Sequence, residues 1–330
     1  MHTRRQVCKL LTAALGSTAL LPARSFAQQD WEPNQPIEVL VMGGPGGGAD
    51  LAVKFLVKII DDNKWCPSPF KIRNMPENGG ADALVELSRR EGNAHTLLFT
   101  LNSFYTTPMA RPDLAIDIAR FAPIARMSED TFLLWVETSR TDVQTFEDFV
   151  MAVKAAGPGR WTMGGTGFDS EDQLLTDFLN SSYGLKMEYR SFSGGGEVAT
   201  ALASGVVQST VNNPAEVRRQ LAEGKVKPIA SFTNQRLPAF LRTPALRETG
   251  MTFTYLMQRS IVGAPGLPQP ALDWYIQLFE RVYDSIEWQT YRRENSLISN
   301  LISGPELTAY WLREREKHQR WLQAMKAMRG

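Results

Sequence analysis

Short apolar runs alternate along the chain with stretches in which apolar residues recur every three or four positions. The first run, residues 37–42, is rich in β-branched residues and ends at the glycine-rich segment 43–48. From Asp50 to Leu56, apolar residues return at the spacing of a helix face. Because strands and helices differ in this period, the pattern predicts a strand, a glycine loop and a helix in that order.

The same alternation continues to the end of the chain and predicts a series of parallel β-α-β units. A proline-punctuated stretch, residues 108–123, interrupts the pattern without a predicted element. The predicted strands after the first are 70–73, 96–101, 132–136, 161–163, 187–189, 206–211, 226–230, 252–255 and 259–263. The predicted helices after the first are 81–89, 146–155, 171–179, 197–203 and 215–222, followed by three that begin at Pro270, Ile286 and Pro305.

The number of alternating elements favours two doubly wound α/β domains over one, as does a length of 330 residues. We expect residues 28–130 to form the first segment of domain 1 and residues 131–250 to form domain 2. Residues 251–330 are expected to return to domain 1 and to end in helices. Aromatic residues along the last of these helices, such as Trp311 and Trp321, are interpreted as core packing.

The first 27 residues have the pattern of a secretory signal peptide. Arg4, Arg5 and Lys9 precede a short apolar run, and a small-residue cleavage site ends at Ala27. The run is shorter than the roughly 20 residues that span a bilayer. We therefore expect cleavage near Ala27 and a soluble, periplasmic protein. The arginine pair also resembles a twin-arginine signal, so the export route stays open between that and the general secretory route.

Charge and composition exclude several classes of function. The whole chain has 36 Lys and Arg against 35 Asp and Glu, so no excess of positive charge is available for a nucleic acid. The leader holds four of the basic residues and no acid, which leaves 32 against 35, a net charge of about −3. After cleavage only Cys66, His95 and His318 remain of the cysteines and histidines. These residues are too few for an intramolecular disulfide or a Cys/His metal cluster.

The glycine loop 43–48 is typical of an anion site, because glycines let backbone N–H groups approach a ligand at a helix N-terminus. Residues 44–49 also match the dinucleotide fingerprint G-x-G-x-x-A. Pro45 is atypical of that fingerprint, and Asp50 would face a pyrophosphate at close range. A structural turn, in which Asp50 caps the helix, is a third interpretation.

A comparable loop, residues 164–173, joins a predicted strand to a helix in the second series. Ser170 and Gln173 have the spacing of a capping box, so Ser170 is either a helix cap or a ligand contact. Two such loops that follow the carboxyl ends of their strands are expected to face one another across a cleft. A serine nucleophile is disfavoured, because the chain has no G-x-S-x-G elbow.

The segment 37–56 resembles the opening of the substrate-binding receptors of tripartite tricarboxylate transporters, the Bug family. The resemblance continues in order through nearly the whole mature chain, at residues 74–80, 95–100, 192–196, 205–207, 212–213 and 263–265. It implies a two-domain Venus-flytrap protein of the periplasmic-binding type. Such a protein has no catalytic residue, cofactor or metal, closes on a small organic carboxylate and presents it to the membrane permease subunits of the transporter.

Carried over by position, the resemblance assigns two ligand loops. The implied ligand-binding residues are Gly46, Gly47, Gly48, Asp50, Gly165, Thr166, Gly167, Ser170, Gln173 and Asn213. Gln173 is a neutral amide where many members of the family have histidine. Neither loop contains Arg or Lys, which favours capture of a carboxylate by backbone amides, hydroxyls and water. The alternatives are an exported oxidoreductase with a nucleotide cofactor and a sensory module of the same fold.

Overall fold

The computed structural model describes residues 31–168, 170–251 and 253–329. Trp31–Gly330 forms one compact unit. The predicted signal peptide lies outside the described residues. In the part of the chain that is described, no helix is long and apolar enough to span a membrane.

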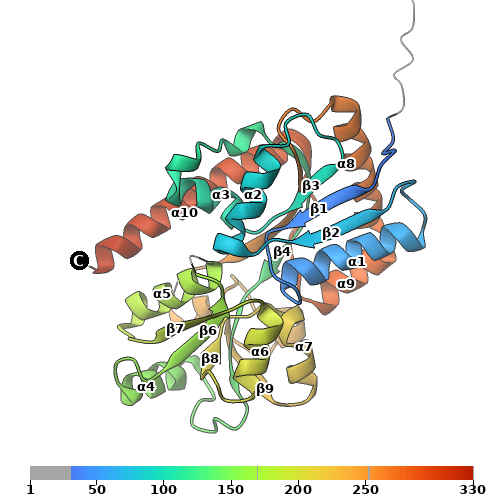
Figure 1. The fold of residues 1–330 in the computed structure, drawn as a ribbon. Helices are drawn as coiled ribbons and strands as arrows, with labels where there is room; N and C mark the ends of the chain where they lie inside the picture. The colour runs from blue at the N-terminus through green and yellow to red at the C-terminus, as the bar shows by residue number, and fades with distance from the viewer. Residues whose placement is uncertain (1–30, 169, 252, 330) are drawn as a thin grey trace, which may run out of the picture. The chain divides into compact units, whose positions relative to one another are not determined.

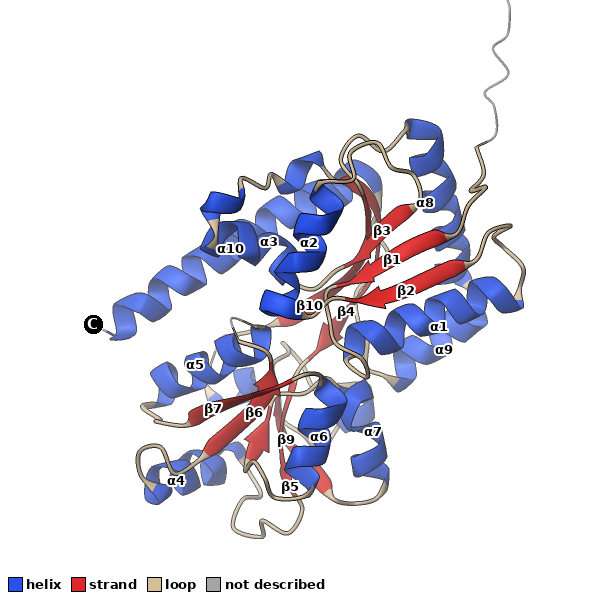
Figure 2. Cartoon of the chain, viewed as in Figure 1, coloured by secondary structure: helices blue, strands red, loops and turns tan. Residues whose placement is uncertain are grey.

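The unit contains two five-stranded sheets (Figures 1 and 2). The first has the order β2-β1-β3-β10-β4 and the second has the order β7-β6-β8-β5-β9. The strands of the first sheet are β1 Ile37–Val41, β2 Phe70–Asn74, β3 Thr96–Phe99, β4 Ala122–Thr131 and β10 Leu256–Gly263. Those of the second are β5 Leu133–Glu137, β6 Thr162–Thr166, β7 Glu188–Phe192, β8 Ser209–Thr210 and β9 Val226–Ser231.

Helices cover both sheets and complete the predicted α/β class. They are α1 Gly48–Asp62, α2 Ala81–Ser88, α3 Ser103–Ala110, α4 Phe146–Ala156, α5 Glu171–Tyr183, α6 Gly195–Ala203, α7 Pro214–Ala222, α8 Gln269–Asp284, α9 Ile286–Glu294 and α10 Gly304–Arg329. Figure 2 shows them on both sides of the strands. The two-sheet α/β fold predicted from the sequence is therefore confirmed.

The strand β1 shows why this fold buries both faces of its sheet. Its alternate residues Val39 and Val41 join one apolar cluster with α1 and α8. The residues between and after them, Leu40 and Met42, join a second cluster with α2, α3 and α10. A strand packed on both faces has no polar side to present, which explains why every residue of β1 except Glu38 is apolar.

The predicted parallel β-α-β units account for only part of each sheet, because both sheets are mixed. Strand β10 runs antiparallel to both β3 and β4, and β5 runs antiparallel to both β8 and β9. The chain leaves the first sheet at the end of β4, enters the second at β5 after Phe132, and returns to the first as β10. The chain therefore passes from one sheet to the other close to each of the expected domain limits. The limits themselves stay a prediction.

Two further local differences have physical causes. Residues 103–110 form the short helix α3 even though it contains Pro108. The helix is stabilised by its buried face, which includes Phe104 and Tyr105. Phe253 and Tyr255, expected in a strand, lie outside any strand and pack with Phe132 and other apolar residues of the second sheet. Thr252 is outside the described residues.

Candidate functional site

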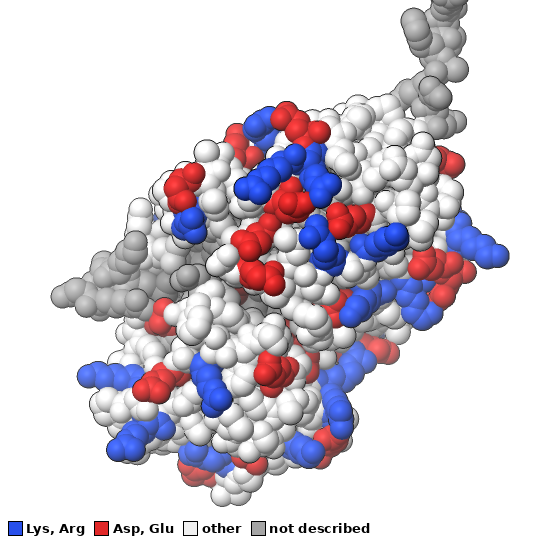
Figure 3. All heavy atoms as spheres, viewed as in Figure 1, with Lys and Arg blue, Asp and Glu red and all other residues white. Residues whose placement is uncertain are grey.

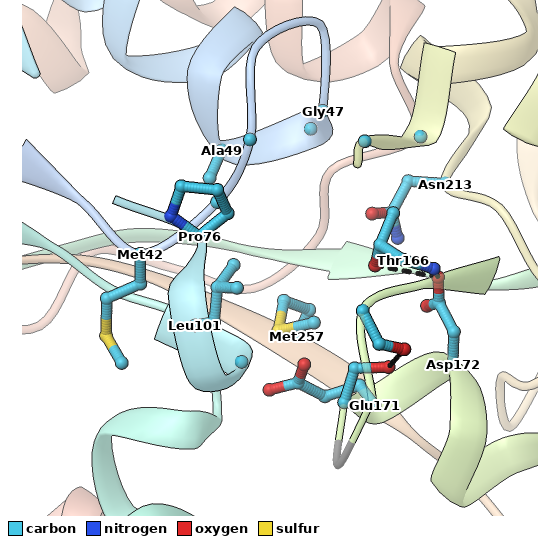
Figure 4. Close-up of a pocket in the computed structure, with 18 of the residues that line it drawn as sticks. Met42, Gly47, Ala49, Pro76, Leu101, Thr166, Glu171, Asp172, Asn213 and Met257 are labelled. Carbon is cyan, nitrogen blue, oxygen red and sulfur yellow. Dashed lines mark hydrogen bonds between the residues drawn. The ribbon is translucent and has the colours of Figure 1, made fainter. Parts of the chain in front are cut away.

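A cavity of about 360 Å³ is lined by elements that belong to both sheets. Figure 4 shows Met42, Pro76 and Leu101 on one side and Thr166, Asp172 and Asn213 on the other. The lining residues are Met42, Gly43, Gly44, Gly47, Gly48, Ala49, Pro76, Glu77, Asn78, Gly79, Leu101, Phe132, Thr166, Gly167, Phe168, Ser170, Glu171, Asp172, Phe192, Ser193, Gly194, Gly195, Asn213, Glu216, Met257 and Arg259. We call this cavity the central pocket.

In the first glycine loop, the backbone N–H groups that were expected to hold a ligand already donate hydrogen bonds to other atoms of the protein. The Gly46 N–H donates to Asp50 Oδ2 at 2.8 Å, and the Gly47 N–H donates to the Gly44 carbonyl at 3.1 Å. The N-cap of α1 is Gly47, so the interpretation of Asp50 as the N-cap was wrong. Asp50 lies in the first turn, where its carboxylate accepts from Gly46 and pairs with Lys54 at 2.7 Å.

The Gly48 N–H donates to a carboxylate that comes from the other sheet's helices, Glu216 Oε1 on α7, at 2.8 Å. The second carboxylate oxygen of Glu216 accepts from Asn212 Nδ2 at 2.9 Å and from the Asn213 N–H at 3.0 Å. A side chain of the protein therefore occupies the anion position that the sequence predicts at the start of α1. This contact also ties α7 to α1.

The first glycine loop packs closely against the segment before α6, and glycine is required for that approach. A Cβ atom on Gly44 would lie 2.1 Å from the Ser193 carbonyl oxygen, and one on Gly194 would lie 2.7 Å from the Pro45 carbonyl oxygen. Neither position has room for a side chain. These glycines therefore permit the two loops to touch, in addition to any role toward a ligand.

The loop after β6 is organised by a carboxylate of α5. Thr166 donates to Asp172 Oδ2 from both its N–H, at 2.8 Å, and its hydroxyl, at 2.9 Å. The Gly167 N–H donates to the Phe192 carbonyl at 3.0 Å. Ser170 is the N-cap of α5, and its hydroxyl accepts from the Gln173 N–H at 3.3 Å. The capping interpretation of Ser170 is therefore confirmed, while its contact with a ligand stays a prediction.

Arg259 on β10 is the one cationic side chain among the described residues of the pocket lining. It is 1% exposed, and its Nη2 donates to Asp130 Oδ2 at 2.6 Å and to Asn213 Oδ1 at 3.0 Å. Its Nε also donates to Asp130 Oδ2, at 3.2 Å. The buried Nη1 atom has no hydrogen-bond acceptor among the described residues. The guanidinium of this lining residue therefore has two N–H groups without an acceptor among the described residues, on an atom that is closed to solvent in this structure.

Acidic side chains dominate the electrostatics of the pocket. Glu171 and Asp172, at the start of α5, are 6% and 7% exposed. Burial, followed by the nearby charge of Glu216, raises the pKa of Asp172 to about 8, against the opposing effect of hydrogen bonds from Thr166. Burial also raises the pKa of Glu171 and of Glu216. The charge of Arg259 lowers the pKa of Glu171 and of Glu216, but burial has the larger effect.

Six of the ten residues implied as ligand-binding line this pocket. They are Gly47, Gly48, Thr166, Gly167, Ser170 and Asn213. The other four, Gly46, Asp50, Gly165 and Gln173, are outside its lining. Gln173 instead lines an adjacent cavity of about 440 Å³, which shares Asn78, Ser170 and Glu171 with the central pocket. We place the site in the central pocket, because the buried charges from both sheets meet there.

The sequence reasoning missed the charged residues of the pocket. Glu171 and Glu216 each fall in the first turn of a helix, where an acid is explained by capping alone. Arg259 lies in a strand, where a single cation among apolar residues is the signal that could have found it. No group of three or more His, Cys, Asp or Glu within the described ranges is placed to hold a metal ion.

Acidic and basic side chains are interspersed over the face shown in Figure 3. Many of them form exposed ion pairs, such as Arg73 with Glu38 and Arg236 with Glu248. This face therefore presents no broad field of one sign.

Comparisons with known proteins identify one family of receptors. The model of the tripartite tricarboxylate transporter family receptor matches residues 63–273. A UPF0065 protein from Cupriavidus necator is 23% identical and aligns with 83% of this chain and 81% of its own. Protein BugT from Bordetella pertussis is 22% identical, over 67% of this chain and 68% of its own.

Solved structures share the fold at low sequence identity. The periplasmic binding protein BugD has a TM-score of 0.81 at 16% identity and covers 89% of this chain and 98% of its own. An R. palustris protein with adipate has a TM-score of 0.79 at 19% identity, covering 91% and 98%. MatC from Rhodopseudomonas palustris, with bound malate, has a TM-score of 0.76 at 21% identity, covering 90% and 99%.

Proposed function

The chain belongs to the family of tripartite tricarboxylate transporter receptors, and on this premise we propose that it captures a small organic carboxylate in the central pocket. It then delivers the carboxylate to the membrane permease subunits of such a transporter. Two similar structures that contain malate and adipate support this class of ligand. The proposed role needs no cofactor, metal or catalytic residue.

One observation carries the proposal: Arg259, the cation of the pocket lining, is buried, and its Nη1 atom has no acceptor among the described residues. A ligand reaches this atom only when the neighbouring groups move apart, as in the opening proposed below. Asp130, on the neighbouring strand β4, already holds the other side of the guanidinium, so its orientation is fixed before a ligand arrives. A carboxylate oxygen is a natural acceptor for an N–H group of arginine, because both partners are charged. We therefore assign the ligand carboxylate to Arg259 in place of the glycine-loop amides.

The six predicted residues in the lining keep a role in this proposal as further ligand contacts. Gly46, Asp50, Gly165 and Gln173 become supporting residues or residues without a ligand role, because they are outside the central pocket. The dinucleotide alternative is disfavoured by the same geometry. Two carboxylates, Asp50 and Glu216, accept hydrogen bonds from the first glycine loop and would repel a pyrophosphate there.

Capture in a cleft requires the two sheets to separate and close, so we propose that residues 131–250 move as a body against the rest of the mature chain. Opening breaks the Glu216 to Gly48 hydrogen bond and separates Ser193 from Gly44. Small-angle scattering is expected to give a smaller radius of gyration with ligand than without. An unchanged radius at saturating ligand contradicts the hinge but not the binding.

A thermal-shift screen of the mature chain against mono-, di- and tricarboxylates, including malate and adipate, tests the function. At about 100 times its dissociation constant, a ligand adds about 2.7 kcal/mol to the free energy of unfolding. Titration calorimetry of each hit is expected to give one site per chain. NAD serves as the comparison ligand, and a shift with NAD but with no carboxylate would reverse the assignment.

We also propose that the chain is exported and is cleaved near Ala27 to act in the periplasm. The leader pattern of residues 1–27 supports this proposal, and the family of receptors is periplasmic.

A further inference from the structure

Two carboxylates on helices of the second sheet reach helices of the first sheet, and each does so at a helix N-terminus. Glu216 is the third residue of α7, and its Oε1 accepts from the Gly48 N–H at the start of α1, at 2.8 Å. Glu171 is the first residue of α5, and its Oε1 accepts from the Ser103 N–H at the start of α3, at 2.8 Å. The two sheets are therefore joined twice by the same arrangement. We call these two hydrogen bonds the cross-sheet contacts.

Each of the two carboxylates also serves the helix on which it lies. Glu216 Oε2 accepts from the Asn213 N–H at 3.0 Å, which completes the capping box of α7. Burial raises the pKa of the Glu171 carboxyl, and backbone hydrogen bonds from Glu171 itself, Ser103 and Asn102 oppose that effect. An anion is stabilised at the positive end of a helix dipole, and here each anion meets two such ends. It meets both only while the two helices lie close together.

The cross-sheet contacts lie at separate places along the central pocket. Figure 4 shows Glu171 well apart from Gly47, the residue that precedes Gly48. Both partners in each contact belong to the protein, and a hydrogen bond to a charged acceptor is about twice as strong as one between neutral groups. The contacts therefore stabilise the arrangement in which the sheets lie close together, whatever molecule lies between them.

We propose that Glu216 and Glu171 are closure residues, whose cross-sheet contacts hold the two sheets together around a ligand and strengthen the binding of every ligand alike. This inference rests on the hinge in the proposed function. It gives both side chains a positioning role, because each acts on the ligand through the separation of the sheets.

Two consequences distinguish closure residues from ordinary ligand contacts. The apparent affinity of a site equals its intrinsic affinity multiplied by the fraction of the protein that is competent to bind. A weaker cross-sheet contact lowers that fraction and so weakens chemically different ligands by one common factor. The two contacts also break in the same motion, so weakening either one exposes the other, and this coupling is reciprocal.

The test shortens each carboxylate without removing its charge. Glu216→Asp leaves an acid that can still cap α7, but draws the carboxylate back from Gly48 by one methylene. Glu171→Asp does the same at Ser103. The matched control is Glu197→Asp, because Glu197 is also the third residue of a helix of the second sheet, α6. Its hydrogen bonds among the described residues are to Ser193 of its own loop, at 3.0 Å from the N–H and 2.6 Å from the hydroxyl.

Hydrogen–deuterium exchange of the mature chain without added ligand, read by mass spectrometry, tests the coupling. Glu216→Asp is expected to speed exchange in the peptide that contains Ser103, and Glu171→Asp in the peptide that contains Gly48. Each increase is expected to be about fivefold to tenfold, as for the loss of a hydrogen bond to a charged group. Exchange in β1, at the centre of its apolar clusters, is expected to stay unchanged, which separates opening from global unfolding. The Glu197→Asp control is expected to change neither peptide.

Titration calorimetry with malate and adipate tests the common factor. The two diacids differ in chain length, so a side chain that contacts the ligand directly would affect them unequally. Glu216→Asp is expected to weaken both by the same factor, up to about tenfold.

The outcomes separate this inference from the proposed function. Faster exchange confined to the altered contact overturns the inference, because the two contacts then do not open together. Losses of malate and adipate that differ by more than about fivefold overturn it too, since Glu216 then contacts the ligand. Tighter binding by Glu216→Asp also overturns it, because the carboxylate then competes with the ligand for the start of α1. If the parent binds no carboxylate, the proposed function fails, and the exchange experiment still decides whether the two contacts close together.

Discussion

Replacing Arg259 by methionine removes the cation on which the site is built and leaves its partner buried. The variant loses contacts of 2.6 Å and 3.2 Å to Asp130 and one of 3.0 Å to Asn213. Asp130, 1% exposed, then retains only the Thr131 N–H, at 2.9 Å, as a hydrogen-bond donor among the described residues. Breaking a buried pair on one side costs about 3 to 5 kcal/mol, because an uncompensated charge remains.

Urea unfolding of the mature chain at pH 8 measures this cost directly. Thermal unfolding gives a second measure of the same cost. At about 2 °C per kcal/mol for a chain of this size, its midpoint is expected to fall by about 6 to 10 °C. The matched control is Arg219→Met, since Arg219 forms an exposed pair with Glu223 at 2.9 Å. That change is expected to cost less than about 1 kcal/mol.

The cost of Arg259→Met depends on pH with a defined sign. Burial already raises the pKa of Asp130, and loss of the guanidinium raises it further. A carboxyl whose pKa is raised in the folded state stabilises the protein below its unfolded pKa and loses that effect as pH rises. The variant is therefore expected to be closest to the parent at pH 5 and furthest from it at pH 8. A loss below about 1 kcal/mol at pH 8, or a loss that shrinks as pH rises, refutes the reasoning.

Four further predictions concern single positions. Burial lowers the pKa of His318 to about 4, so the folded state loses about 3 kcal/mol as pH falls from 6.5 to 4, and His318→Phe is expected to lose less in urea unfolding. The raised pKa of Asp172 has the opposite sign, so Asp172→Asn is expected to keep stability that the parent loses as pH rises through about 8, and equal pH profiles would contradict this. A Cβ on Gly195 would lie 2.1 Å from Glu216 Cδ, so Gly195→Ala is expected to cost about 1 to 3 kcal/mol, whereas the control Gly196→Ala, whose Cβ has 3.5 Å of room, costs less than about 1. Exported protein is expected to begin within a few residues of Gln28 by N-terminal sequencing, and a retained Met1 would disprove the leader.

The order of elements could be predicted because the periods of the apolar residues differ between strands and helices. The strand, glycine loop and helix at residues 37–56 follow from β-branched residues, a glycine run and a return at helical spacing. The antiparallel course of β5 and β10 could not be predicted, because a strand buried on both faces has the same apolar sequence in either direction.

The glycines of the candidate site could be predicted from the sequence, but its charged residues could not. Glycine-rich loops before helices are conspicuous, so Gly47, Gly48 and Thr166 were placed near the pocket. The Gly48 amide is satisfied by Glu216, 168 residues away along the chain, and this contact follows only from the tertiary fold. The Thr166 amide is satisfied by Asp172, 6 residues away. A charged residue in a sequence indicates solvent exposure far more often than a pocket, so Arg259 was overlooked.

The central claim is that a carboxylate binds at Arg259 in the central pocket, and a crystal structure of the mature chain with the tightest ligand of the screen tests it most directly. We expect electron density for one ligand among the lining residues, with a carboxylate oxygen about 2.7 to 3.2 Å from Arg259 Nη1. Density for the ligand in the adjacent cavity beside Gln173, or in the central pocket with its carboxylate on the glycine-loop amides and away from Arg259, would contradict the account.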